Sequence, residues 1–162
     1  MATPHSLQVS RIIAADAETL FQAWTDPSVL SEWWRQAGEG WAFAGASIDL
    51  RVGGRYRLAM TAPDGKRHVA AGVYREIQRP LRLVFTWDWE DPATRAGDTL
   101  VTVEFESVGD HRTKIVVKHE RFADVTKLGR HERGWMELLR LLQCFIHSQA
   151  AAVSEGKKAY DH

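Results

Sequence analysis

The residue best suited to chemistry in this sequence is His119. It follows Ile115 and Val117 at alternate positions, so in a β-strand all three side chains lie on one inward face. We expect this histidine near the rim of an internal pocket, where a neutral imidazole can hydrogen-bond a ligand. The alternative is a packing histidine whose ring nitrogens bind neighbours in its own chain.

Seven tryptophans in 162 residues are a second chemical signal. Phe85, Trp87 and Trp89 alternate along one face of a predicted strand and should meet the long C-terminal helix. Large flat rings on a concave face favour a cavity over a core of interlocking aliphatic side chains. Trp33 and Trp34 are adjacent in a predicted helix, where side chains point about 100° apart, so we expect at most one to face inward.

The spacing of the other reactive residues predicts neither a metal site nor a cofactor site. His131 and Glu132 do not continue into the His-Glu-x-x-His pattern of zinc enzymes. Gly53 and Gly54 lack the lysine of a phosphate-binding loop. Asp49 and Arg51 flank this glycine corner, where we expect a structural role rather than catalysis: either an ion pair or a carboxylate that caps the N–H groups of the glycine turn. We therefore expect no metal and no cofactor, and we assign no catalytic residue.

The elements that carry these residues follow from hydrophobic periodicity. Alternating apolar residues predict strands over residues 7–13, 41–49, 55–60, 67–77, 81–89, 99–105 and 113–119. Two short helices follow the first strand, one capped by Asp16 and one started by Asp26 and Pro27. Because six of the strands are consecutive and joined by short turns, we expect an antiparallel meander with one buried face.

A long helix is predicted over residues 125–153. Trp135, Leu139, Leu142 and Ile146 form a continuous apolar stripe along it. The stripe matches the apolar face of the sheet, so each should cover the other. The predicted fold class is α+β: a curved antiparallel sheet of about seven strands around a long C-terminal helix, in a single domain of residues 1–162.

Composition restricts the partners. The 21 basic and 21 acidic residues balance, so no net field favours nucleic acid. No apolar run approaches the roughly 20 residues that cross a bilayer, and we expect no membrane insertion. The single cysteine, Cys144, excludes an internal disulfide and suits a cytoplasmic location. The sequence leaves a homodimer open.

Several ordered motifs resemble one known family. The string FQAWTDP at residues 21–27 with the Trp33–Trp34 pair, and DLRVGGRY at residues 49–56, are similar to signatures of the activator of heat-shock protein 90 ATPase homologue family. That family belongs to the START-like (SRPBCC) superfamily, whose helix-grip (Bet v-like) fold has this element order. The resemblance spans roughly residues 7–146. It implies the fold, a link to the stress response and a chaperone partner; against that partner, the sequence lacks the chaperone activator's separate N-terminal domain.

Three functions fit this reading, in decreasing order of preference. The first is a binding protein for a hydrophobic small molecule, held between sheet and helix. The second is an enzyme of the cyclase, dehydratase or hydrolase kind, with His119 or Tyr56 transferring a proton. The third is a co-chaperone-like interaction protein. The candidate ligand-binding residues face inward on the sheet and helix: Trp34, Tyr56, Leu58, Phe85, Trp87, Val103, Val117, His119, Trp135 and Leu139.

Overall fold

The computed structural model describes residues 5–34 and 40–160 and has the predicted α+β fold. Seven strands and two short helices precede one long helix. The elements in chain order are β1 (His5–Ile13), α1 (Ala17–Thr25), α2 (Pro27–Trp33), β2 (Ala42–Ile48), β3 (Arg55–Thr61), β4 (Arg67–Gln78), β5 (Arg82–Trp89), the short 3₁₀ helix η1 (Pro92–Thr94), β6 (Thr99–Gly109), β7 (Arg112–Phe122) and α3 (Val125–Tyr160).

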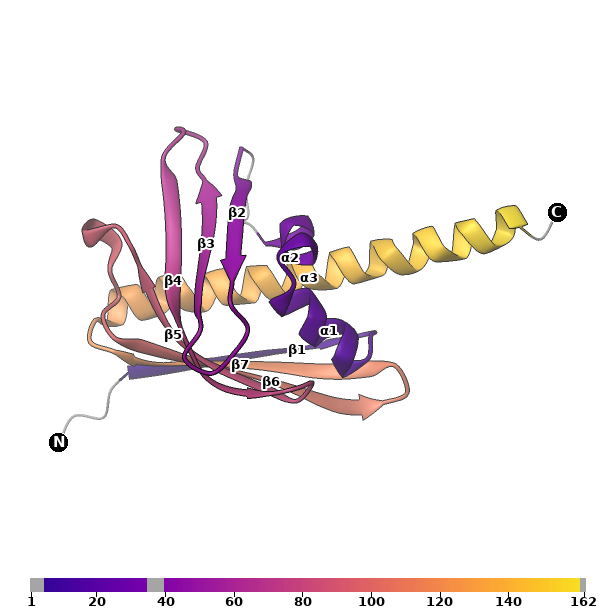
Figure 1. The fold of residues 1–162 in the computed structure, drawn as a ribbon, viewed down its shortest axis with the longest axis horizontal. Coiled ribbons are helices and arrows are strands. Elements are labelled where there is room, and N and C mark those ends of the chain that lie inside the picture. Colours follow the sequence, from indigo (N-terminus) through magenta and orange to yellow (C-terminus); the bar gives the residue numbers. More distant parts are fainter. Residues whose placement is uncertain (1–4, 35–39, 161–162) are drawn as a thin grey trace.

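All seven strands form one antiparallel sheet in the order β1-β7-β6-β5-β4-β3-β2. Strands β2 to β7 make the expected meander, and β1 joins its far edge by pairing with β7. The sheet curves strongly: β1, β6 and β7 run along α3, whereas β2, β3 and β4 stand steeply across it (Figure 1). The sheet therefore wraps partly around the helix, and its concave side holds the core.

Helix α3 covers that concave side through the predicted apolar stripe. Trp135, Leu139, Leu142 and Ile146 are between 0% and 8% exposed, which confirms the predicted packing. Asp124 caps the helix by accepting a 2.7 Å hydrogen bond from the backbone N–H of Thr126. The helix ends at Tyr160 rather than near residue 153, because its alanine-, lysine- and glutamate-containing last turns favour helix.

The two short helices close one end of the sheet. The prediction that at most one of Trp33 and Trp34 faces inward was wrong. Trp33 and Trp34 both face inward, with exposed fractions of 2% and 1%. Helix α2 ends at Trp33, and the backbone of Trp34 is extended at φ −80° and ψ 106°. The 100° rule for neighbours in a helix does not apply across this boundary, so the extended backbone lets the second ring face inward too.

Strands β4 and β5 pack unusually closely at Gly72. A Cβ atom at this position would lie 1.9 Å from the carbonyl oxygen of Thr86, so no side chain fits. The hydroxyl of Tyr56 donates a 2.5 Å hydrogen bond to the same carbonyl, which ties β3 to β5 across β4. One predicted boundary was wrong: Leu81 is 57% exposed and lies in the turn before β5, not on its inner face.

The corner before β3 has the expected geometry. Arg51 Nε and Asp49 Oδ2 form an ion pair at 2.8 Å. Gly53 has a φ of +84°, a conformation that glycine adopts without steric cost. Among the described residues, no helix is both long and apolar enough to cross a bilayer.

Candidate functional site: an aromatic cavity

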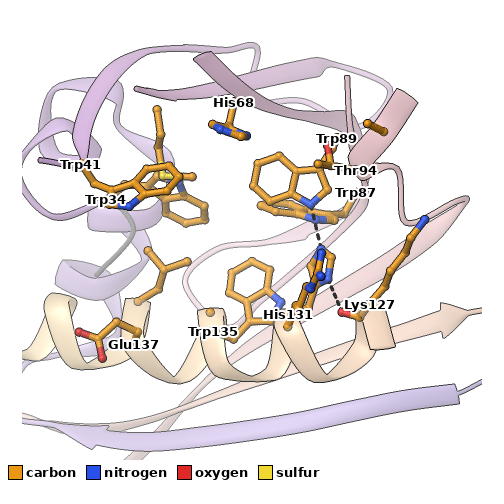
Figure 2. A pocket seen from close by; sticks show the side chains of 15 residues that line it. Trp34, Trp41, His68, Trp87, Trp89, Thr94, Lys127, His131, Trp135 and Glu137 are labelled. Carbon is orange, nitrogen blue, oxygen red and sulfur yellow. Dashed lines mark hydrogen bonds between the residues drawn. The ribbon is translucent and has the colours of Figure 1, made fainter. Parts of the chain in front are cut away.

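A cavity of about 250 Å³ lies between α3 and the inner face of β3, β4 and β5. Figure 2 shows Trp34 and Trp41 on one side of it and Trp87 and Trp89 on the other, with Trp135 and His131 projecting from α3. Aromatic and polar residues predominate in its wall, with two small and two large non-aromatic apolar residues: Trp34, Trp41, Met60, His68, Trp87, Trp89, Ala93, Thr94, Lys127, Arg130, His131, Gly134, Trp135, Glu137 and Leu138.

The tryptophans of the wall pack on one another and hold the cavity open. The ring centroids of Trp87 and Trp135 lie 5.1 Å apart, and those of Trp34 and Trp135 lie 5.9 Å apart. On the part of the wall opposite α3, the ring centroids of Trp41 and His68 lie 5.4 Å apart. Most of these contacts are tilted or edge-to-face, as aromatic pairs prefer. Rigid rings packed at such angles cannot collapse into a nearby void as flexible aliphatic chains can.

His131 is held in one tautomer by its neighbours. Its Nε2 atom accepts a 3.0 Å hydrogen bond from the indole N–H of Trp89. Its Nδ1 atom lies 2.7 Å from the carbonyl oxygen of Lys127, which can only accept, so Nδ1 carries the proton. Burial lowers the pKa of His131, which keeps the ring neutral and this arrangement intact.

His119 holds the opposite tautomer. The indole N–H of Trp135 donates to His119 Nδ1 at 3.0 Å, so the proton is on Nε2, 2.8 Å from Thr99 Oγ1. The Thr99 hydroxyl donates in turn to the carbonyl of Trp87 at 2.5 Å. Burial, with a smaller contribution from His131, lowers the pKa of His119 to about 2.

His119 therefore lies in the core rather than at the pocket rim. It is 0% exposed, and both ring nitrogens are bound within the protein. Residue periodicity placed it correctly on the inner face. The depth was misjudged because β7 continues to Phe122, and the Phe122 ring packs over the imidazole at 4.3 Å.

Two buried indole N–H groups, those of Trp34 and Trp87, have no hydrogen-bond partner among the residues that the structure describes. Three other tryptophans are satisfied, since Trp33, Trp89 and Trp135 donate to Ala23, His131 and His119. Leaving a buried donor unpaired costs about 1–3 kcal/mol, so native proteins rarely do so without a reason. Both free donors belong to residues that line the same cavity.

The charged residues of the cavity give it a positive end. Lys127 donates to the carbonyl of Arg95, a neutral partner, and Arg130 is exposed one helical turn further along. Among the described residues, neither of them has a carboxylate within ion-pair distance. Glu137 lies at the other end of the cavity, and its charge is compensated by an ion pair with Arg140.

The predicted ligand-binding residues divide into three groups. Trp34, Trp87 and Trp135 line the cavity. Tyr56, Leu58 and Phe85 line, with Trp34, a separate space of about 10 Å³, which holds no more than one water molecule. The remaining four belong to the packed core and line neither space: Val103, Val117, His119 and Leu139.

The hydroxyl group of Tyr56 is also hydrogen-bonded within the protein. It donates to the carbonyl of Thr86. Burial, with a smaller effect of Tyr74, raises the pKa of Tyr56 well above its ordinary value, so the phenol stays protonated. In this arrangement the two side chains considered for proton transfer, Tyr56 and His119, hold protein hydrogen bonds rather than facing the cavity.

Several cavity residues were missed from the sequence, although helical spacing could have found them. Lys127 and His131 precede Trp135 on α3 at spacings of four residues. They therefore extend the predicted apolar stripe, which begins at Trp135, toward the start of the helix. Trp41 and His68 had no comparable signal, because only the tertiary structure brings them together. Over residues 5–34 and 40–160, no group of three or more His, Cys, Asp or Glu side chains is arranged to hold a metal.

A curved antiparallel sheet gripping a long C-terminal helix, with a cavity between them, defines a START-like helix-grip protein. Comparison with known families agrees. Residues 14–146 match the Activator of Hsp90 ATPase homolog 1-like protein family, and the chain belongs to that family. No curated protein matches the sequence.

Solved structures show the same fold. An AHSA1 protein from Silicibacter pomeroyi is 26% identical, with a TM-score of 0.76 over 90% of this chain and 99% of that one. A Rhizobium leguminosarum protein is 25% identical, with a TM-score of 0.76 over 90% and 95%. An Hsp90 activator from Plasmodium falciparum is 26% identical, with a TM-score of 0.67 over 88% and 96%.

Proposed function

We propose that this protein binds a small apolar or amphipathic molecule in the aromatic cavity. The observation that carries the proposal is a space of about 250 Å³ that is lined by aromatic rings and is partly open to solvent. Mostly apolar pockets of this kind, with a few polar groups in the wall, are where proteins usually bind small molecules. A cavity of roughly 150 Å³ already admits a benzene ring, so this one suits a ligand of about two rings.

The chemistry of the wall supports binding rather than catalysis as the main role. The rings of Trp34, Trp87 and Trp135 offer large apolar surfaces at fixed angles, so a bound ligand immobilises few side chains. His131 also lies in this wall, and its ring is neutral. Both of its ring nitrogens hold hydrogen bonds, one with the indole of Trp89 and one with the carbonyl of Lys127. A proton-transfer role would require breaking one of these bonds.

Gly134 offers a direct test, because it lines the cavity and a Cβ atom there would meet nothing within 4 Å. Gly134→Leu has room to extend into the space that the ligand would use. We expect the neutral probe N-phenyl-1-naphthylamine to fluoresce with the wild-type protein and to bind Gly134→Leu at least about tenfold more weakly.

Gly129→Leu is the matched control. Gly129 lies on the same helix, outside the cavity lining, and a Cβ atom there makes only an ordinary 3.8 Å contact with Arg133. The control should bind the probe as the wild type does. Absence of probe binding by the wild type, or equal loss in both variants, would refute the proposal.

A second candidate is co-chaperone activity, favoured by the family match and by the likeness to the Plasmodium falciparum Hsp90 activator. It would work through the outer surface, in the cytoplasm and under stress. Stimulation of an Hsp90 ATPase by this protein, retained in Gly134→Leu, would support it. A rate equal to that of the chaperone alone would exclude it.

A further inference from the structure

The two free indole donors and the positive end of the cavity specify the ligand further, provided that the proposed binding function holds. Buried N–H groups without partners favour a ligand that brings acceptor atoms to them. A purely hydrocarbon ligand would leave both donors unsatisfied. The ligand should therefore carry oxygen acceptors on a flat apolar frame.

The position of the charges decides where the strongest acceptor lies. Trp87 is on the same side of the cavity as Lys127, as Figure 2 shows, and Arg130 lies one helical turn from Lys127. A carboxylate at this end would accept from the Trp87 indole and gain from two cations that lack carboxylate partners among the described residues. Trp34 neighbours Trp87, with ring centroids 6.2 Å apart, on the side away from Lys127, and its N–H would meet a second, neutral oxygen.

A cage of tryptophans can also bind a cation through the faces of its rings. The charges here oppose that use. The one carboxylate in the lining, Glu137, is paired with Arg140, whereas Lys127 and Arg130 would repel a cationic ligand. Free N–H donors do not help a cation either. The observations thus favour an anion over an ammonium ligand.

We propose that the natural ligand is a planar aromatic carboxylic acid of about two rings, with its carboxylate at the Trp87 and Lys127 end and a hydroxyl or carbonyl oxygen at the Trp34 end. The rings would stack among the indoles, and their acid group would be recognised by one neutral donor and two nearby cations. Specificity of this kind rejects analogues that lack the acceptor, because the buried donor is then left unpaired.

The test compares ligands that share the naphthalene frame, each displacing N-phenyl-1-naphthylamine from the wild-type protein at low salt. The expected order of affinity is 2-naphthoate, then 2-acetonaphthone, then 2-isopropylnaphthalene, with 2-naphthylmethylammonium weakest. We expect about tenfold between the acid and the methyl ketone, since a charge-assisted hydrogen bond is roughly twice as strong as a neutral one. Adding a 6-hydroxyl to 2-naphthoate should tighten binding severalfold.

Variants assign each step to its residue. Lys127→Met with Arg130→Gln should abolish the preference for the acid over the ketone, whereas Arg133→Gln, an exposed cation of the same helix outside the lining, should not. Trp87→Phe should remove the preference for the ketone over the hydrocarbon. Trp34→Phe should remove the gain in affinity from the 6-hydroxyl group. Each preference is the ratio of two affinities measured on the same variant, so a change in the stability of that variant does not produce the same result.

The outcomes separate the two proposals. If the hydrocarbon or the ammonium compound binds at least as tightly as the acid, the acid proposal is wrong and the binding function stands. If neither the probe nor any naphthalene compound binds, both are wrong. If the acid preference survives loss of Lys127 and Arg130, its assignment to this end of the cavity is wrong.

Discussion

Trp87 and Trp33 are both almost fully buried, but their surroundings differ. Trp33 packs against Trp24 and Trp34 and its N–H is bonded to Ala23, outside the cavity. Trp87 borders the cavity and has a free N–H. A side chain with empty space on one side has fewer contacts to lose, and its removal also removes an unsatisfied donor.

We therefore predict that Trp33→Ala costs about 3–5 kcal/mol of unfolding free energy, the usual range for a packed core aromatic. Trp87→Ala should cost only about 1–2 kcal/mol, because part of its environment is already open. Urea denaturation of both variants measures the difference. Equal losses would show that the space beside Trp87 is closed in solution.

The paired histidines give a second prediction at the residue scale. The pKa of His119 is about 2 in the folded protein, against an ordinary value of about 6.5 when unfolded. At pH values between these two pKa values, His119 is protonated in the unfolded chain but neutral in the native protein. Stability is thus complete above about pH 6.5 and falls as the pH is lowered, by about 1.4 kcal/mol per pH unit. His131 adds to the loss, since its pKa is lowered too.

From pH 7 to pH 5 we expect His119 alone to remove about 2 kcal/mol of stability, measured by urea denaturation at each pH. His119→Gln should flatten this dependence, because the amide can accept from Trp135 and donate to Thr99 without titrating. His147→Gln, an exposed site on α3, is the control and should keep the wild-type slope.

The tautomers of the two histidines can be measured directly. Nitrogen NMR should show His119 as the Nε2–H tautomer and His131 as the Nδ1–H tautomer. Reversed tautomers would contradict the hydrogen-bond assignment.

At the scale of elements, the close approach of β4 and β5 depends on Gly72. A methyl group there would overlap the Thr86 carbonyl, which also accepts from Tyr56, so the strands would have to separate. Gly72→Ala should therefore cost about 2–3 kcal/mol, near the upper end of the range for overpacking.

Gly129→Ala is the matched comparison, because it makes the same chemical change in a helix where the added methyl has room. It should raise stability by about 0.5–1 kcal/mol through the better helix propensity of alanine. Thermal unfolding of the two variants should thus give melting temperatures on opposite sides of the wild type. A neutral Gly72→Ala would mean that the strands relax apart easily.

At the scale of the whole molecule, stability comes from a sheet and a helix that bury each other's apolar faces. The described residues show no metal cluster on which folding could depend. We predict that treatment with EDTA shifts the melting temperature by less than about 1 °C, whereas loss of a structural metal would remove many degrees. Scanning calorimetry with and without the chelator checks this, and recovery of a large loss by added zinc would overturn it.

Calorimetry with added ligand measures binding in the cavity as a change in the melting temperature of the whole protein. A ligand that binds only the native state adds about 2.7 kcal/mol at a hundred times its dissociation constant. For a domain of this size each kcal/mol corresponds to roughly 2–4 °C. We predict that saturating 2-naphthoate raises the melting temperature of the wild type by about 5–10 °C and that of Gly134→Leu by much less.

The sequence by itself determined the architecture. Alternation along residues 99–105 and 113–119, and the stripe of Trp135, Leu139, Leu142 and Ile146, are local patterns whose period matches a strand or a helix. Each pattern assigns side chains to one face, and packing the long helix on the sheet buries the apolar faces of both. Family motifs at residues 21–27 and 49–56 reinforced that result.

Only the tertiary structure decided the cavity and its chemistry. Trp41 and His68 belong to the part of the wall opposite α3, and neither has a sequence pattern that relates it to Trp87 or His131. His119 is buried deeply because β7 continues to Phe122, and Trp34 turns inward because α2 ends at Trp33. Each histidine meets one indole because the curved sheet brings β5 and β7 against α3. Hydrophobic periodicity specifies the face on which a side chain lies, but the space left between faces is set by how all the side chains pack together.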